Sequence, residues 1–534
     1  MARSTRSSKP PSPRKRGTPS RTRRAASAAP DIAPAPAPSG TAAGGTAGAA
    51  GAVRIRFYCQ GIGDCHLLRF EKPDGPFWML IDCGIHSSVP NGTQTIRDIV
   101  DNILTLTKRL DVIVLTHEHW DHNSGFFSAL DKFKQFEVGE IWLGWTENAA
   151  DPQARELDKF KGEAMKALQG ASQRLDRAQG LTSYLAGVQQ GLHAVLGFNF
   201  GAKGEKVRSA RDAAIALAPP GKVKFLEPSN APFELPVAPK MRVYVLGPPR
   251  DKAMLAVTDR ASEMYGINGF SMAPVVSALN NSFGVSEGSD HFWDDATAPF
   301  DSNEGFVLSE LLKTPADAAS QSITDTDDRT SSEPTTKLIH GRYAGQNADQ
   351  DWRRIDNDWL GVSADLAIQI DKRTNNSSLV LAFEFLETHR VMLFVGDAQV
   401  GNWLSWKDVQ WKIADKTVSA HDLLARTVFY KVGHHGSHNA TLKQNGLELM
   451  TSADLSAFIP TNKIDAGRVG WGEMPFEPLL GDLKARAHDR VIRADDPWLK
   501  QAAPQPDFAK APGAIRAVEH DPTGKGLWVQ LDIG

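Results

Sequence analysis

Four side chains that commonly bind metals lie within six consecutive residues: His117, His119, Asp121 and His122. The apolar run 112–115 directly before them is typical of a buried strand. Imidazoles and carboxylates are costly to bury without compensation, and a divalent metal ion is their usual partner. In a tight loop leaving a strand, the first two histidines can face one ion, while the aspartate and the last histidine face another. The spacing therefore predicts the start of a two-metal site, and the alternative is a polar surface loop.

Three other strand ends carry residues of the same chemical kind: Asp82, Asp397 and the pair His434-His435. In this order the motifs resemble those of the metallo-β-lactamase superfamily, and they imply its αββα sandwich fold. The resemblance implies that Asp82 supports the histidine loop and that Asp397 bridges two metal ions. It also implies that one member of the His434-His435 pair is the last ligand, and the sequence leaves open which one.

Two longer runs resemble the ComEC/Rec2 branch of this superfamily, the nuclease-like domain of DNA-uptake proteins. They are Gly-Ile-Gly-Asp-Cys at 61–65 and Lys-Val-Gly-His-His-Gly-Ser at 431–437. The resemblance covers roughly residues 53–145 and 370–530. No apolar run approaches the roughly 18 residues that a membrane helix needs. We therefore expect a stand-alone hydrolase in the cytoplasm, without the membrane channel of full-length DNA-uptake proteins.

The superfamily's third histidine motif has no counterpart here, because the segment 374–378 reads Thr-Asn-Asn-Ser-Ser. We therefore expect one tight metal site and one weaker site, the latter held by the first two histidines of the loop. His291 or His340 is a candidate for the missing ligand. Asn375 and Asn376 are predicted either to hydrogen-bond a substrate phosphate or a metal-bound water, or to cap a turn before the next strand.

The implied chemistry is hydrolysis by a water activated by one or two Zn²⁺ or Mn²⁺ ions. Asp121 or Asp397 would orient this water, and the histidine of the pair that is not a ligand, or His438, would protonate the leaving group. Ser437 is predicted to lie near a phosphate, and Lys431 to be a solvated strand residue. We expect a phosphodiesterase or nuclease. The alternatives are a hydrolase of small molecules (lactone, cyclic nucleotide or phosphoester) and a non-catalytic, metal-stabilised binding module.

The elements that must position these residues alternate between strands and helices, which favours an α/β sandwich. The first half of the fold is expected at 53–145, with strands at 54–60, 66–71, 78–81, 110–116 and 140–145 and a helix at 93–108. The second half is expected at 371–534, with strands at 379–385, 390–395, 427–432, 457–459, 491–493 and 527–531. Residues 146–370 are predicted to be an insertion with a helical hairpin at 157–195, a strand at 242–246 and a flexible loop at 314–336.

The amino-acid composition limits the class of protein and the partners that can be expected. A content of 41% hydrophobic and 23% charged residues is ordinary for a soluble globular enzyme. Cys59, Cys65 and Cys83 are expected to be reduced core residues. Residues 1–52, basic and then rich in Ala and Pro, are predicted to be a disordered tail that either tethers nucleic acid or only solubilises the chain. The rest of the chain is acidic, which weakens the case for a nucleic-acid substrate.

Overall fold

The structure is a computed structural model, and it describes residues 51–178, 181, 183–200, 206–257, 358–469, 474–508 and 513–534. The predicted tail, apart from its last two residues, and the predicted loop 314–336 lie outside these ranges. The candidate ligands His291 and His340 lie outside them as well.

The first sheet has eight strands in the order β16-β17-β1-β2-β3-β4-β5-β6. Their bounds are β1 Val53–Tyr58, β2 Cys65–Phe70, β3 Phe77–Cys83, β4 Arg109–Val114, β5 Glu137–Gly144, β6 Val223–Leu226, β16 Ile515–His520 and β17 Trp528–Ile533. The pairs from β3 to β6 are parallel, and the others are antiparallel. Parallel strands are usually covered on both faces, and the buried residues of β3, β4 and β5 show such cover here.

The second sheet has seven strands in the order β15-β14-β13-β10-β9-β8-β7. Their bounds are β7 Phe233–Leu235, β8 Met241–Gly247, β9 Val380–Phe385, β10 Val391–Phe394, β13 Thr427–Lys431, β14 Ser456–Ile459 and β15 Val491–Arg493. A separate hairpin joins β11 (Gln410–Ile413) to β12 (Lys416–Ser419). Each strand predicted from the sequence matches a strand of the two sheets. The segment predicted to be an insertion, 146–370, supplies β6 to the first sheet and β7 and β8 to the second.

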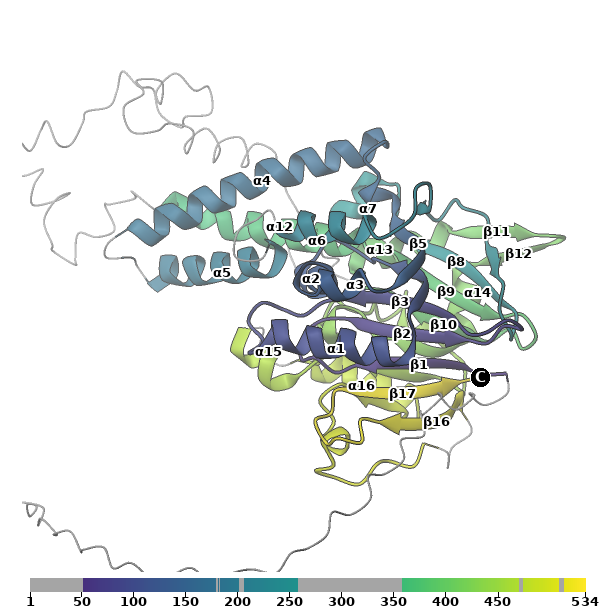
Figure 1. Cartoon of the computed structure of the whole chain (residues 1–534). Coiled ribbons are helices and arrows are strands. Elements are labelled where there is room, and N and C mark those ends of the chain that lie inside the picture. The colour runs from purple at the N-terminus through teal and green to yellow at the C-terminus, as the bar shows by residue number, and fades with distance from the viewer. Residues whose placement is uncertain are drawn as a thin grey trace, which may run out of the picture. The chain divides into compact units, whose positions relative to one another are not determined.

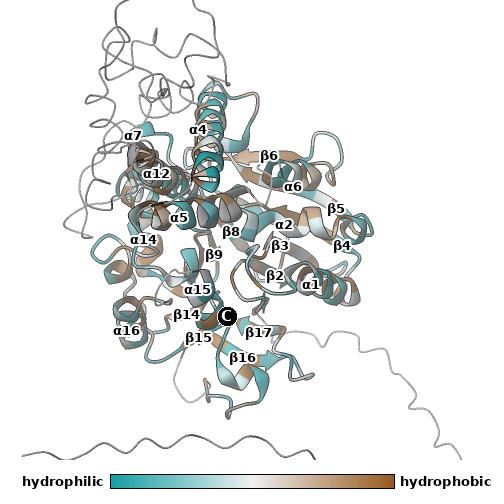
Figure 2. Cartoon of the chain, turned by 90° about the vertical axis from the view of Figure 1, so that its left-hand side faces the viewer, coloured by the Kyte–Doolittle hydropathy of each residue, from teal (hydrophilic) through white to brown (hydrophobic). Residues whose placement is uncertain are grey.

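The two sheets pack face to face over one apolar core to which both contribute. Within it, the ring of Phe57 on β1 stacks on that of Phe458 on β14, with centroids 4.2 Å apart. The helices α1 (Gly92–Leu106), α2 (Trp120–Ser128) and α3 (Leu130–Phe133) cover the outer face of the first sheet. On the second sheet this cover comes from α13 (Val400–Ser405), α14 (Ala420–Ala425) and α16 (Glu477–Arg486). Figure 2 shows α1 on one side of the strands and α14 and α16 on the other.

A further group of helices lies beside the sandwich, at the upper left of Figure 1. It contains α4 (Pro152–Arg177), α5 (Ser183–Phe200) and α12 (Val362–Asn376), which share an apolar cluster. The buried positions of α4, among them Ala164, Leu168, Ala171 and Leu175, recur every three or four residues, as the sequence predicted. The shorter helices α6 (Lys206–Ile215) and α7 (Lys252–Ala256) connect this group to the sheets. None of the described helices is long and apolar enough to cross a lipid bilayer.

The carboxyl ends of the parallel strands of both sheets meet at one place. Asp82 lies at the end of β3, the histidine loop follows β4, Asp397 follows β10, and the pair of histidines follows β13. The loop is held very close to the end of β3, because a Cβ atom on Gly84 would lie 2.2 Å from the carbonyl carbon of Asp121. In α/β folds such an edge is the usual position of a binding site.

Candidate metal centre

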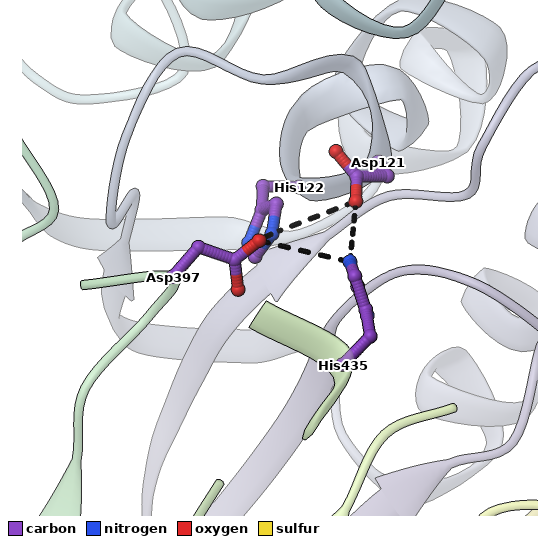
Figure 3. A group of neighbouring side chains, drawn as sticks. All are labelled: Asp121, His122, Asp397 and His435. Atoms are coloured by element: carbon purple, nitrogen blue, oxygen red, sulfur yellow. Dashed lines mark hydrogen bonds and ion pairs between the residues drawn. The ribbon is translucent and has the colours of Figure 1, made fainter. Parts of the chain in front are cut away.

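Four buried side chains from the two sheets converge on one point: Asp121, His122, Asp397 and His435 (Figure 3). Their ligand-type atoms all lie within 4.8 Å of one another. Oδ2 of Asp397 is 3.1 Å from Nε2 of His122 and 3.6 Å from Nε2 of His435. Two imidazoles and two carboxylates are a donor set suited to a divalent ion such as Zn²⁺ or Mn²⁺.

Both imidazoles are oriented by contacts of their other ring nitrogen. Nδ1 of His122 lies 2.7 Å from Oδ2 of Asp82, and Nδ1 of His435 lies 3.0 Å from the carbonyl oxygen of Pro460. Since both partners are acceptors, each Nδ1 donates to its partner, and each Nε2 is directed at the centre, where a bound cation would replace its proton. Asp82 has a left-handed backbone, with φ of 55°, and its carboxylate also accepts from the N–H and hydroxyl groups of Thr116.

Several buried polar atoms of this group have no hydrogen-bond partner among the described residues. They are Oδ1 of Asp121, Nε2 of His122 and Oδ2 of Asp397. Burial disfavours a charged imidazole at His122, but the carboxylates of Asp397 and Asp121 outweigh it and raise its pKa well above the ordinary value. Buried polar atoms without partners are rare in proteins. Two of these atoms, Nε2 of His122 and Oδ2 of Asp397, lie 3.1 Å apart at the centre of the cluster, and this arrangement fits a bound cation.

His117 and His119 form a second, smaller group beside the first. Nε2 of His117 lies 2.9 Å from Nδ1 of His119, and both side chains are buried. Burial lowers the pKa of both imidazoles well below the ordinary value, which keeps them neutral. Neither belongs to a cluster of three or more ligand-type residues in the described part of the chain. Oδ1 of Asp371, on α12, lies 3.9 Å from Nε2 of His119, and the sequence gave no reason to single out this aspartate.

The two histidines that follow β13 have different environments, which addresses the alternative that the sequence left open. His435 joins the four-residue cluster. His434 donates its backbone N–H to Oδ1 of Asp397 over 2.9 Å, and its ring lies within hydrogen-bond distance of Ser437 and Asn375. Burial lowers the pKa of His434 to about 4, so its imidazole is neutral at pH 7.

Of the other site residues predicted from the sequence, some lie next to the four-residue cluster and others only support the fold. Asn375 and Asn376 are the last residues of α12, directly before the turn into β9. The amide of Asn376 donates to the carbonyl oxygens of Leu255 and Val257, so this residue anchors the helix end. The hydroxyl of Ser437 contacts the imidazole of His434 and the amide oxygen of Asn439, and it thereby orients the His434 ring. His438 is exposed and its ring packs against Phe476, outside the cluster.

Lys431 is the clearest error of the sequence prediction. It is 1% exposed rather than solvated, and its ammonium group contacts the carboxylate of Asp64 and the carbonyl oxygen of Gly396. Its Nζ also lies 4.0 Å from Oδ1 of Asp397. Asp64 itself forms a second cluster of ligand-type atoms with Asp82 and His122. The signal in the sequence was a lysine within an otherwise uncharged, buried strand.

A family model described as the metallo-beta-lactamase superfamily matches residues 60–156. This segment, which is less than half of the chain, matches a metallo-β-lactamase domain. The match includes the histidine loop, and together with the two layered sheets it confirms the predicted fold class, an α/β sandwich with an insertion. No curated protein matches the chain. The superfamily match and the buried His/Asp clusters support a metal-dependent hydrolase at the level of the superfamily. The likeness to the ComEC/Rec2 branch stays a prediction.

Proposed function

We propose that this protein is a metal-dependent hydrolase of phosphodiester bonds. The observation that carries the proposal is the buried cluster of Asp121, His122, Asp397 and His435, whose ligand-type atoms all lie within 4.8 Å of one another. These four residues would hold one Zn²⁺ or Mn²⁺ ion. When bound, such an ion supplies a Lewis acid and a source of hydroxide at neutral pH. His117 and His119 would hold a second ion more weakly, because the described residues offer them fewer partners.

Neighbouring groups of the protein orient the two carboxylates of the centre. The backbone N–H of His434 fixes Oδ1 of Asp397, which leaves Oδ2 directed at the two ligand imidazoles. Oδ2 of Asp121 lies 2.8 Å from Nε2 of His435, so these two ligand atoms are adjacent. A carboxylate held in this way accepts a hydrogen bond from the attacking water and orients it, as was predicted for Asp121 or Asp397.

His434 and Asn375 form the polar surface next to the cluster, with Nε2 of the imidazole 3.4 Å from Nδ2 of the amide. Oδ1 of Asn375 has no hydrogen-bond partner among the described residues. With a pKa of about 4, His434 is a poor proton donor at pH 7. We therefore assign it and Asn375 to hydrogen bonding with the substrate, in place of the proton-donor role predicted from the sequence.

The experiment is a comparison of substrates with purified protein loaded with Mn²⁺ or Zn²⁺. Bis(p-nitrophenyl) phosphate is expected to be cleaved, and Asp121→Ala should abolish the cleavage, because it removes a ligand to the tighter site. Asp482→Ala, an exposed aspartate on α16, is the matched control and should retain activity. Cleavage of a lactone without any phosphodiesterase activity would favour the small-molecule alternative. Stoichiometric metal without any turnover would favour the binding module.

A narrower form of the proposal is that the natural substrate is a nucleic acid. Linear single- and double-stranded DNA would be tested with the full chain and with a chain lacking residues 1–52. If the basic tail tethers DNA, its deletion weakens binding and makes it less dependent on salt. Unchanged binding would leave the tail a solubilising role.

A further inference from the structure

A cavity of about 370 Å³ lies among the helices beside the sandwich, and the metal centre does not use it. Side chains from α4, α6, α7 and α12 line it, and so does Glu118 of the histidine loop. The volume is within the roughly 300–1,000 Å³ of small-molecule sites. Glu118 lies between the first two histidines of the loop, so one wall of the cavity belongs to the same loop as the metal centre.

The acids that line the cavity in the described part of the chain are each paired with a cation. Glu118 pairs with Lys161 over 3.1 Å, and Glu147 pairs with Arg211 over 3.0 Å. The two others are paired in the same way, Glu156 with Lys252 and Asp158 with Arg208. Among the described residues, these pairs also account for every lining cation except one, Arg373 of α12.

Arg373 has no acid within ion-pair distance among the described residues, and its Nε is buried without a hydrogen-bond partner. Its guanidinium group lies 5.2 Å from the centre of the Phe160 ring. Burial lowers the pKa of Arg373, and no nearby carboxylate opposes this shift. A partly buried guanidinium group that lacks a counter-ion presents its N–H groups to an anion, and it binds carboxylate or phosphate in a bidentate way.

The cavity lining also includes an apolar part. Leu157 and Phe160 come from α4, Leu255 from α7 and Ile370 from α12. An apolar wall beside a single uncompensated cation is suited to a ligand with one anionic group and a flat, apolar body. Inorganic phosphate would satisfy only the cation.

We propose that this cavity is a binding site for a small organic monoanion, with Arg373 pairing the anionic group and the Phe160 side holding the apolar body. Aryl carboxylates and aryl phosphonates are two such ligands, because each has one acidic group attached to an aromatic ring. The site does not depend on the proposed hydrolysis, because it uses none of the residues of the metal centre.

The test is isothermal titration of the full, metal-loaded chain with benzoate, phenylphosphonate and inorganic phosphate. At least one of the two aryl anions should bind saturably, and phosphate should bind more weakly than phenylphosphonate. Arg373→Met keeps the length of the side chain and should weaken binding by about tenfold or more, the effect of losing a hydrogen bond to a charged group. Arg177→Met, an exposed arginine at the end of α4, is the matched control and should bind like the parent.

A second variant separates loss of the site from loss of the fold. Ala256→Trp fills the cavity from α7 and leaves Arg373 in place, so it should weaken binding while thermal unfolding stays cooperative. Three outcomes would overturn the proposal. They are no saturable binding of either aryl anion, equal binding by the parent and Arg373→Met, and binding that His122→Gln abolishes but Arg373→Met does not. The last would place the anion at the metal centre.

Discussion

Oδ2 of Asp397 lies 3.1 Å from Nε2 of His122, although the two residues follow strands of different sheets. The contact joins the end of β10 to the loop after β4 at the point where both sheets end. Without a metal ion the contact is an ion pair, because the carboxylates of Asp397 and Asp121 raise the pKa of His122 well above its ordinary value. The pair thus makes the metal centre depend on both layers of the sandwich.

Asp397→Asn tests this contact while keeping the size of the side chain. We expect the purified variant to lose its tightly bound metal, because the amide is a weaker ligand than the carboxylate. The measurement is metal content per chain by mass spectrometry after dialysis. Asp408→Asn, an exposed aspartate after α13, is the control and should retain the parent's metal content. Full metal content in Asp397→Asn would remove this residue from the ligand set.

Asp82→Asn tests the support of the histidine loop. Asp82 contacts the ring nitrogen of His122 that faces away from the centre. Loss of such a supporting partner typically lowers metal affinity by about 10–100-fold. The measurement is competition with a chromophoric chelator. Unchanged affinity would mean that His122 is oriented by other contacts or is not a ligand.

The two neighbouring histidines should separate metal binding from turnover. His435→Gln is expected to release the metal, because Nε2 of His435 belongs to the cluster. His434→Gln should retain the metal but lower turnover, because its ring faces Asn375 at the substrate side. Metal content and phosphodiesterase rate are measured on the same samples. If His434→Gln loses metal and His435→Gln keeps it, the assignment is reversed.

Lys431→Met should destabilise the fold strongly. It leaves the carboxylate of Asp64 buried without its cation, and breaking a buried pair in this way costs about 3–5 kcal/mol. The free energy of unfolding is measured by urea titration at pH 7. The double variant Lys431→Met/Asp64→Asn should recover part of the loss, since no buried charge remains unpaired. The exposed control Lys412→Met on β11 should stay within about 0.5 kcal/mol of the parent.

The strands and the histidine loop could be predicted because their signals are local. An apolar run is typical of a buried strand wherever it occurs, and four ligand-type residues within six positions restrict each other's geometry. The positions of Asp82, Asp397 and the histidine pair at strand ends followed from the same reasoning.

The different environments of His434 and His435 could not be predicted, because they depend on backbone angles. Both residues are left-handed, with φ of 41° and 54°, and this turn sends adjacent rings to different sides. The burial of Lys431 depends on Asp64, which is distant in sequence and belongs to the other half of the sandwich. The position of Asp371 beside His119 required the packing of α12, which no periodic signal at 371–376 indicated.

The pairing of β1 with β17 places Val53 directly opposite Ile533. The first and last strands of the described chain are therefore neighbours in one sheet, and a short peptide can join them. New ends can be opened in the turn of the β11–β12 hairpin, between Ile413 and Lys416. Such a circular permutant would keep every strand neighbour and every residue of the metal centre. In such a permutant the order of the strands along the sequence would change, while their positions in the two sheets would stay the same.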